Sequence, residues 1–163
     1  MKITYDGILK WFEAYFAAFN KNAGPLAGVV KMKSYFTDDF EFWSYNQPGE
    51  RPRNREALLM TMVHPGLHEH LTPLEYAVDL KKLIVVVQFQ VQFSDHPSGQ
   101  VWPAKQASTH YHLLLDKDNE PKIKKILYFM EHRPPEESDY RKLWEKYREK
   151  EMAENGRLAD QLK

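Results

Sequence analysis

The sequence predicts an α+β protein whose helices lie mainly in the first part of the chain and whose strands lie mainly in the second. In residues 4–20 apolar side chains recur at spacings of three and four, which is typical of a helix with one buried face. In residues 87–93 valine and phenylalanine alternate with glutamine, which is typical of a strand with one buried face. This change of period along the chain indicates that helices and sheet are segregated.

Three helices are expected in the first 62 residues. The helix at 4–20 ends at an asparagine-containing turn, and a second helix runs from Pro25 to about residue 34. After a turn at 37–39, an aromatic strand begins. Asn54 then caps a short third helix that ends at Met62.

The second half predicts strands at 74–80, 83–95, 101–116 and 122–132, arranged as consecutive antiparallel neighbours. Pro134 and Pro135 end the sheet, and Ser138 caps a last helix with a narrow apolar stripe and a solvated end. The expected organisation is therefore one main domain at 1–135 and a C-terminal helical extension at 136–163.

Composition limits the partners and the chemistry. A chain of 163 residues with 42% hydrophobic residues can bury one core, and its 23 basic residues balance 23 acidic ones. This balance predicts neither nucleic acid nor membrane as a partner. The absence of cysteine excludes disulfides and thiolate chemistry and indicates a cytoplasmic location. The N-terminal segment is not expected to be a signal peptide or a membrane span, because it carries the charged residues Asp6, Lys10 and Glu13.

The order of elements resembles the nuclear transport factor 2-like superfamily, which includes ketosteroid isomerase, scytalone dehydratase and SnoaL-like polyketide cyclases. The segment "EAYFAAFNKNAGPLAGVVKMKSYFTDDFEFW" is similar to the family's first two helices and the start of its first strand, and "RPRNREAL" to the start of its third helix. The resemblance covers about residues 4–133. It implies a cone-like fold, in which a strongly curved antiparallel sheet wraps around three helices and encloses an apolar pocket.

Tyr15 is the first candidate catalytic residue. It lies on the apolar stripe of the first helix and matches the oxyanion-stabilising tyrosine of ketosteroid isomerase, although a plain core tyrosine is the alternative. The general base of that enzyme is not matched, because the end of the first strand offers Ser44 instead of an aspartate. Isomerisation of ketosteroids by that mechanism is therefore not expected.

His70 is the second candidate, since it lies just before the predicted strand at 74–80, near the position of a catalytic histidine in scytalone dehydratase. An imidazole there could transfer a proton during a dehydration or a cyclisation. The alternative is that "HPGLHEH", with His64, His68 and His70, forms a solvated connection.

His110 and His112 share one face of the strand at 101–116. They are candidate acids or bases, because both related enzymes place polar catalytic groups on this strand. The alternation nevertheless favours an outward position for both, with Tyr111 facing the pocket. A metal site is not expected, because no third ligand or zinc-binding motif accompanies the pair.

The first hypothesis is a cofactor-independent lyase, isomerase or cyclase that acts by acid–base catalysis on an apolar carbonyl or polycyclic molecule. The alternative is a noncatalytic ligand-binding or assembly module of the same fold, and a homodimer through the outer face of the sheet is expected in either case. The residues expected to line a substrate pocket are aromatic: Trp11, Trp43, Tyr76, Tyr111 and Tyr128.

Overall fold

The computed structural model describes residues 3–46, 49–131 and 140–163. Its helices and strands are, in chain order, α1 (Tyr5–Asn22), α2 (Leu26–Met32), the 3-10 turn η1 (Lys33–Tyr35), β1 (Phe36–Ser44), α3 (Arg55–Thr61), β2 (Leu67–Asp79), β3 (Ile84–Asp95), β4 (Lys105–Leu115), β5 (Pro121–Met130), α4 (Tyr140–Asn155) and α5 (Leu158–Gln161).

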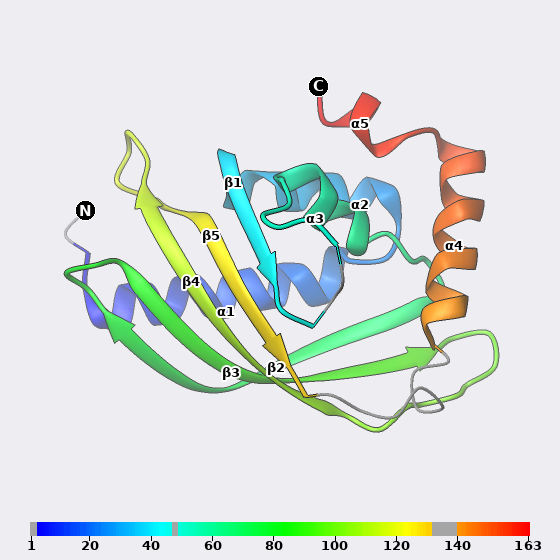
Figure 1. Cartoon of the computed structure of the whole chain (residues 1–163), viewed down its shortest axis with the longest axis horizontal. Helices are drawn as coiled ribbons and strands as arrows, with labels where there is room; N and C mark the ends of the chain where they lie inside the picture. The colour runs from blue at the N-terminus through cyan, green and yellow to red at the C-terminus, as the bar shows by residue number, and fades with distance from the viewer. Residues whose placement is uncertain (1–2, 47–48, 132–139) are drawn as a thin grey trace.

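One curved sheet and one layer of helices make up the molecule. The strand order is β1-β5-β4-β3-β2, with antiparallel pairing from β2 to β5 and a parallel pairing of β1 with β5. The sheet curves around α1, α2 and α3, and α4 stands at one end of it (Figure 1). The predicted α+β class and the curved sheet around three helices are confirmed, but the sheet is mixed and not wholly antiparallel, because β1 runs parallel to β5. No helix among the described residues is long and apolar enough to cross a membrane.

Alternation in β3 fixes which face of the sheet is buried. Its residues at odd positions from 85 to 93 are at most 4% exposed and face the helices. On β4, Tyr111 lies opposite Val85 and Thr109 lies opposite Val87, so the same face of the sheet continues onto β4. The facing helix, α1, buries Phe12, Tyr15 and other residues of its apolar stripe, so helix and sheet share one core.

The segment from 67 to 71 is a strand, so the expected solvated connection is wrong. Leu67 and Leu71 are buried opposite Asp95 and Val91 of β3, and this pairing extends β2 seven residues before the predicted start at Leu74. The strand was missed because most of its other positions are polar.

A β-bulge interrupts the pairing of β2 with β3 between Pro73 and Glu75. Leu74 is the extra residue and is 53% exposed. Before the bulge the inward side chains of β2 are at odd positions, such as Leu71, whereas after it they are at even positions, such as Tyr76.

The start of the third helix agrees with the prediction, whereas the starts of two strands differ from it. The third helix begins as predicted, because Asn54 Oδ1 accepts a hydrogen bond from the backbone N–H of Ala57 at 2.9 Å. The turn predicted at 37–39 is instead part of β1, which starts at Phe36. β4 starts at Lys105 and not at 101, and Val101 keeps only an isolated bridge to Ser94.

The C-terminal helices pack onto the same core as the sheet. Tyr140 at the start of α4 and Leu158 in α5 are at most 1% exposed and belong to the main hydrophobic cluster. The expectation that the end of the chain is solvated is therefore wrong for Leu158. The predicted domain boundary at 135/136, the two prolines that end the sheet and the Ser138 cap lie outside the described residues.

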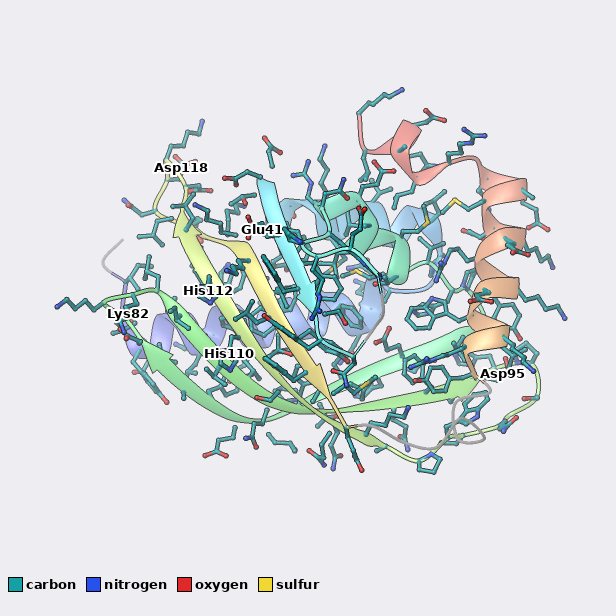
Figure 2. The ribbon with its side chains drawn as sticks, viewed as in Figure 1. Glu41, Lys82, Asp95, His110, His112 and Asp118 are labelled. Carbon is teal, nitrogen blue, oxygen red and sulfur yellow. The ribbon has the colours of Figure 1, made fainter. Side chains whose placement is uncertain are left out.

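Asp95, at the end of β3, connects the sheet to the middle of α4 (Figure 2). Its Oδ1 accepts a hydrogen bond from the hydroxyl of Tyr147 at 2.6 Å, and its Oδ2 accepts one from the backbone N–H of Ser98 at 3.1 Å. The hydrogen bonds from Ser98 and then from Tyr147 hold the pKa of Asp95 below its ordinary value.

Replacing Tyr147 by Phe should lower the free energy of unfolding by about 1 kcal/mol, because the carboxylate loses a charge-assisted donor. Since the pKa of Asp95 is lowered in the folded state, the ionised carboxylate contributes to the free energy of unfolding above a pH of about 4. This contribution is lost as the pH falls through the lowered pKa. Urea denaturation at neutral pH and at pH 3 should therefore show a larger difference between wild type and Tyr147→Phe at neutral pH. Tyr5→Phe, at a position 46% exposed, is the control and should have little effect. A difference that grows toward pH 3 would contradict the assignment.

Candidate active site

A cavity of about 110 Å³ lies between the inner face of the sheet, helices α1 and α3, and α4. Most of its wall is apolar, with phenylalanine, leucine, methionine and isoleucine side chains from both layers. The polar or ionisable side chains in the wall are Tyr15, Thr61, Glu69, Thr109, Tyr111, Tyr128, Tyr140, Arg141 and Trp144. A mostly apolar pocket with a few convergent polar groups is the usual form of a small-molecule site.

Tyr15 reaches this cavity from the buried face of α1. Its ring lies parallel to that of Trp11 at 5.9 Å and edge-on to that of Tyr35 at 5.3 Å, so aromatic packing fixes its direction. Burial, followed by the nearby charge of Glu69, raises the pKa of Tyr15 far above its ordinary value. The phenol is therefore neutral at physiological pH and can donate a hydrogen bond to a bound oxygen.

Tyr111 and Tyr128 line the same cavity from β4 and β5. Burial is the largest cause that raises the pKa of each, so both phenols also keep their protons. The hydroxyl of Tyr128 donates to the sulfur of Met130 at 3.2 Å. The predicted pocket positions of these two tyrosines agree with the cavity wall, and together with Tyr15 they place several neutral phenols around it.

Glu69 and His64 form a buried acid–base pair at the cavity. Glu69 lies on β2 directly opposite the inward-facing Phe93 and has a side chain 14% exposed, whereas His64 is fully buried. Nδ1 of His64 lies 2.8 Å from the carbonyl oxygen of Leu67, and Nε2 lies 3.2 Å from Oε2 of Glu69.

These contacts limit where the protons of the pair can be. The Leu67 carbonyl can only accept, so Nδ1 of His64 carries a hydrogen. The contact between Nε2 and Glu69 is then a hydrogen bond only if one proton lies between them, either on the imidazole or on the carboxyl group. In both arrangements the pair is neutral overall and holds one transferable proton beside the cavity.

The sequence did not identify Glu69 and ranked His64 below His70, because their segment was interpreted as a loop. The signal was present in the alternation of Leu67, Glu69 and Leu71, which places the glutamate on the apolar face once 67–71 is a strand. Ser44, at the position of the missing aspartate, is buried, but its hydroxyl has no hydrogen-bond partner among the described residues and does not line the cavity.

His70 points away from the cavity. It pairs with Gln92 on the outer face and is exposed, because it is one residue removed from the inward Glu69. The ring of His68 lies 5.7 Å from those of both His70 and His96, and burial followed by these neighbours lowers the pKa of His68. The catalytic role expected for His70 therefore has no geometric support at this cavity.

His110 and His112 also lie on the outer face, as the alternation in β4 predicts (Figure 2). They pair with Val86 and Ile84 of β3, whereas Tyr111 between them is 3% exposed and lines the cavity. The alternative that used this pair as acid and base in the pocket is thus contradicted by their position.

The remaining predicted pocket residues lie outside the cavity wall. Trp43 is on the outer face of β1, where its indole N–H donates to Oε2 of Glu41 at 3.1 Å. Trp11 lies on α1 and stacks on Tyr15, and the ring of Tyr76 lies 6.3 Å from that of Phe12. Among the described residues that line the cavity, none of these three side chains, Trp43, Trp11 and Tyr76, is found.

No family model matches the sequence, and no curated protein matches it. Solved structures do. ActVI-ORFA from Streptomyces coelicolor is 13% identical with a TM-score of 0.59, over 79% of this chain and 98% of that one. An NTF2-like protein from Anabaena variabilis is 15% identical with a TM-score of 0.58, over 82% of this chain and 96% of that one.

A third similar structure is an NTF2-like protein of unknown function from Cytophaga hutchinsonii, 15% identical with a TM-score of 0.51, over 80% of this chain and 93% of that one. Identities this low carry no information on chemistry, but the shared arrangement of sheet and helices shows the fold. The chain has the nuclear transport factor 2-like fold.

Proposed function

We propose that this protein is a cofactor-independent enzyme that moves a proton next to the carbonyl group of a small apolar molecule. The observation that carries the proposal is that Glu69, hydrogen-bonded to His64, lines the same apolar cavity as the neutral phenol of Tyr15. A base and a hydrogen-bond donor in one water-poor site are what enolisation requires.

In the proposed reaction the Glu69 carboxylate takes a proton from the carbon beside the carbonyl. The electron pair of the broken C–H bond forms a carbon–carbon double bond, and the π pair of the carbonyl group moves to its oxygen, where the hydroxyl of Tyr15 stabilises the developing negative charge. The protonated Glu69 then returns the proton to another carbon of a conjugated enolate in an isomerase. In a lyase the carbonyl group re-forms, the bond to a hydroxyl group on the next carbon breaks, and the proton from Glu69 lets that hydroxyl group leave as water. His64 acts through Glu69, because the proton that they share holds the carboxyl group in one orientation.

Replacing Glu69 by Gln should slow this proton transfer by about 100-fold or more, because an amide cannot act as the base. A suitable measurement is deuterium incorporation into phenylacetone in heavy water, followed by proton NMR after subtraction of the uncatalysed rate. Glu75→Gln, at an exposed position on the same strand, is the matched control and should exchange like wild type. Wild-type rates in Glu69→Gln would refute the role of this residue.

The same experiment separates the alternative function. If NMR shows that phenylacetone binds to wild type in the cavity while exchange stays at the uncatalysed rate, the protein is a ligand-binding module and the catalytic proposal is wrong.

Replacing Tyr15 by Phe should lower kcat/KM for the exchange by about 100-fold, because the oxyanion loses a hydrogen-bond donor while the ring packing against Trp11 is kept. Tyr5→Phe, on the same helix at a position 46% exposed, is the control. Unchanged kcat/KM in a folded Tyr15→Phe variant would assign the tyrosine to the core alone.

The proposed assembly is a homodimer through the outer face of the sheet. Tyr45 and Phe129 stack there at 4.6 Å and are 46% and 40% exposed, and the ring of His110 lies 5.8 Å from that of Phe129. An exposed aromatic pair of this kind is typical of a contact surface, and the resemblance implies dimers through this face.

Phe129→Glu should convert such a dimer to a monomer in analytical ultracentrifugation, because a carboxylate would be buried without a partner. Val101→Glu, at a loop position 59% exposed, is the control and should leave the mass unchanged. A dimer that survives Phe129→Glu would exclude this face as the interface.

A further inference from the structure

Helix α4 supplies part of the wall of the cavity. Tyr140, Arg141 and Trp144 line it from one side, whereas the rest of the wall comes from α1, α3, the sheet and residues next to them. In Figure 1 this helix crosses the end of the curved sheet toward α2. The extension at the end of the chain is therefore part of the proposed site.

Both ends of α4 are attached to other elements. At its first turn the ring of Tyr140 stacks on that of Phe93 at 4.1 Å, and its hydroxyl accepts a hydrogen bond from Nζ of Lys105 at 3.2 Å. Near its last turn, Oε1 of Glu151 accepts a hydrogen bond from the backbone N–H of Leu26 at 2.8 Å, at the start of α2. These contacts, on the sheet and on the helical layer, hold α4 across the cavity as a fixed wall.

Trp144 is the largest side chain that α4 places in this wall. Its indole stands edge-on to the imidazole of His64 at 5.4 Å and lies 6.0 Å from the ring of Phe93. On the other side the guanidinium of Arg148 lies 5.6 Å from the indole. The indole thus covers the imidazole of His64 and, as part of the cavity wall, occupies volume that a larger ligand would need.

The cavity is small. An engineered cavity of about 150 Å³ binds benzene, and sites for drug-sized ligands span roughly 300 Å³ or more. At about 110 Å³, this cavity is smaller than both, so it admits at most about one ring while α4 is in place. We infer that α4 makes the site selective for compact carbonyl compounds with a single ring or a short chain, and that Trp144 sets this size limit.

This inference rests on the proposed function, which requires that the ligand carries a carbonyl group. It replaces the polycyclic substrate of the first hypothesis with a compact one. Glu69, His64 and Tyr15 keep the roles proposed above. Trp144 is a specificity-determining residue, which acts by excluding longer ligands and not by contact with the transferred proton.

The test measures binding and not turnover. Dissociation constants are determined by isothermal titration calorimetry for phenylacetone, with one ring, and androstenedione, with four. Wild type should bind phenylacetone more tightly than androstenedione. Trp144→Ala should gain about tenfold or more in affinity for androstenedione, whereas its affinity for phenylacetone should stay equal or fall.

Leu143→Ala is the matched control, because Leu143 is the neighbouring half-buried residue of α4 and does not line the cavity. It should keep the wild-type preference. Should Trp144→Ala fail to fold by circular dichroism, Trp144→Phe is expected to show a smaller gain in the same direction. Wild type that binds androstenedione as tightly as phenylacetone, or a folded Trp144 variant without a gain, would overturn the inference.

The two proposals fail in different ways. If size selection by Trp144 holds but Glu69→Gln does not change the exchange rate, the ligand class is right and the base is wrong. If exchange depends on Glu69 but Trp144→Ala does not change the preference, the chemistry stands and the size limit is wrong.

Discussion

The described sheet buries one face against the helices of its own chain, and this constraint determines on which side the candidate groups of the strands lie. Valine and phenylalanine of β3 need the helices on one side, so the partners across β2 and β4 are assigned to the same side by register. Tyr111 enters the core for this reason, whereas the histidines on either side of it are left outside. The histidines that stand out in the sequence are therefore on the opposite face of the sheet from the side chains that can reach a ligand in the cavity.

Glu69 is an ionisable residue on this mostly apolar face, and its carboxyl group has to be stabilised there. A lone carboxylate among aromatic side chains would lose its hydration without replacement, which is unfavourable by several kcal/mol. The hydrogen bond to Nε2 of His64 offsets part of this loss, and the Leu67 carbonyl holds the imidazole in place by accepting from Nδ1. An apolar residue of similar size at position 69 would pack without such support, so stability alone does not require the pair.

The sequence predicted most of the fold, and the reasons for its failures are physical. α1 and β3 are strongly amphipathic, so their periods identify them without tertiary information. The start of β2 is different, because its outward positions carry histidines and its inward positions include a glutamate, which conceals the alternation. α5 was missed since a single buried residue, Leu158, attaches it to the core.

The candidate site was less predictable than the fold for a related reason. Tyr15, Tyr111 and Tyr128 obey the rule that apolar or aromatic residues face inward, and the sequence placed all three in the pocket. An inward-facing carboxylate breaks that rule, so the pattern that identifies a core does not identify Glu69. Its pairing with His64 joins a turn to a strand, and only the folded backbone brings the two together.

The β-bulge at Leu74 has a consequence for how this fold can vary. It reverses the parity of β2, so that odd positions face inward on one side of it and even positions on the other. Loss of Leu74 would remove the bulge and leave the pairs on both sides of it unchanged, with Glu69 opposite Phe93 and Tyr76 opposite Val87, so both side chains would still face inward. The length of this strand can therefore change by one residue without altering the set of side chains on its inner face.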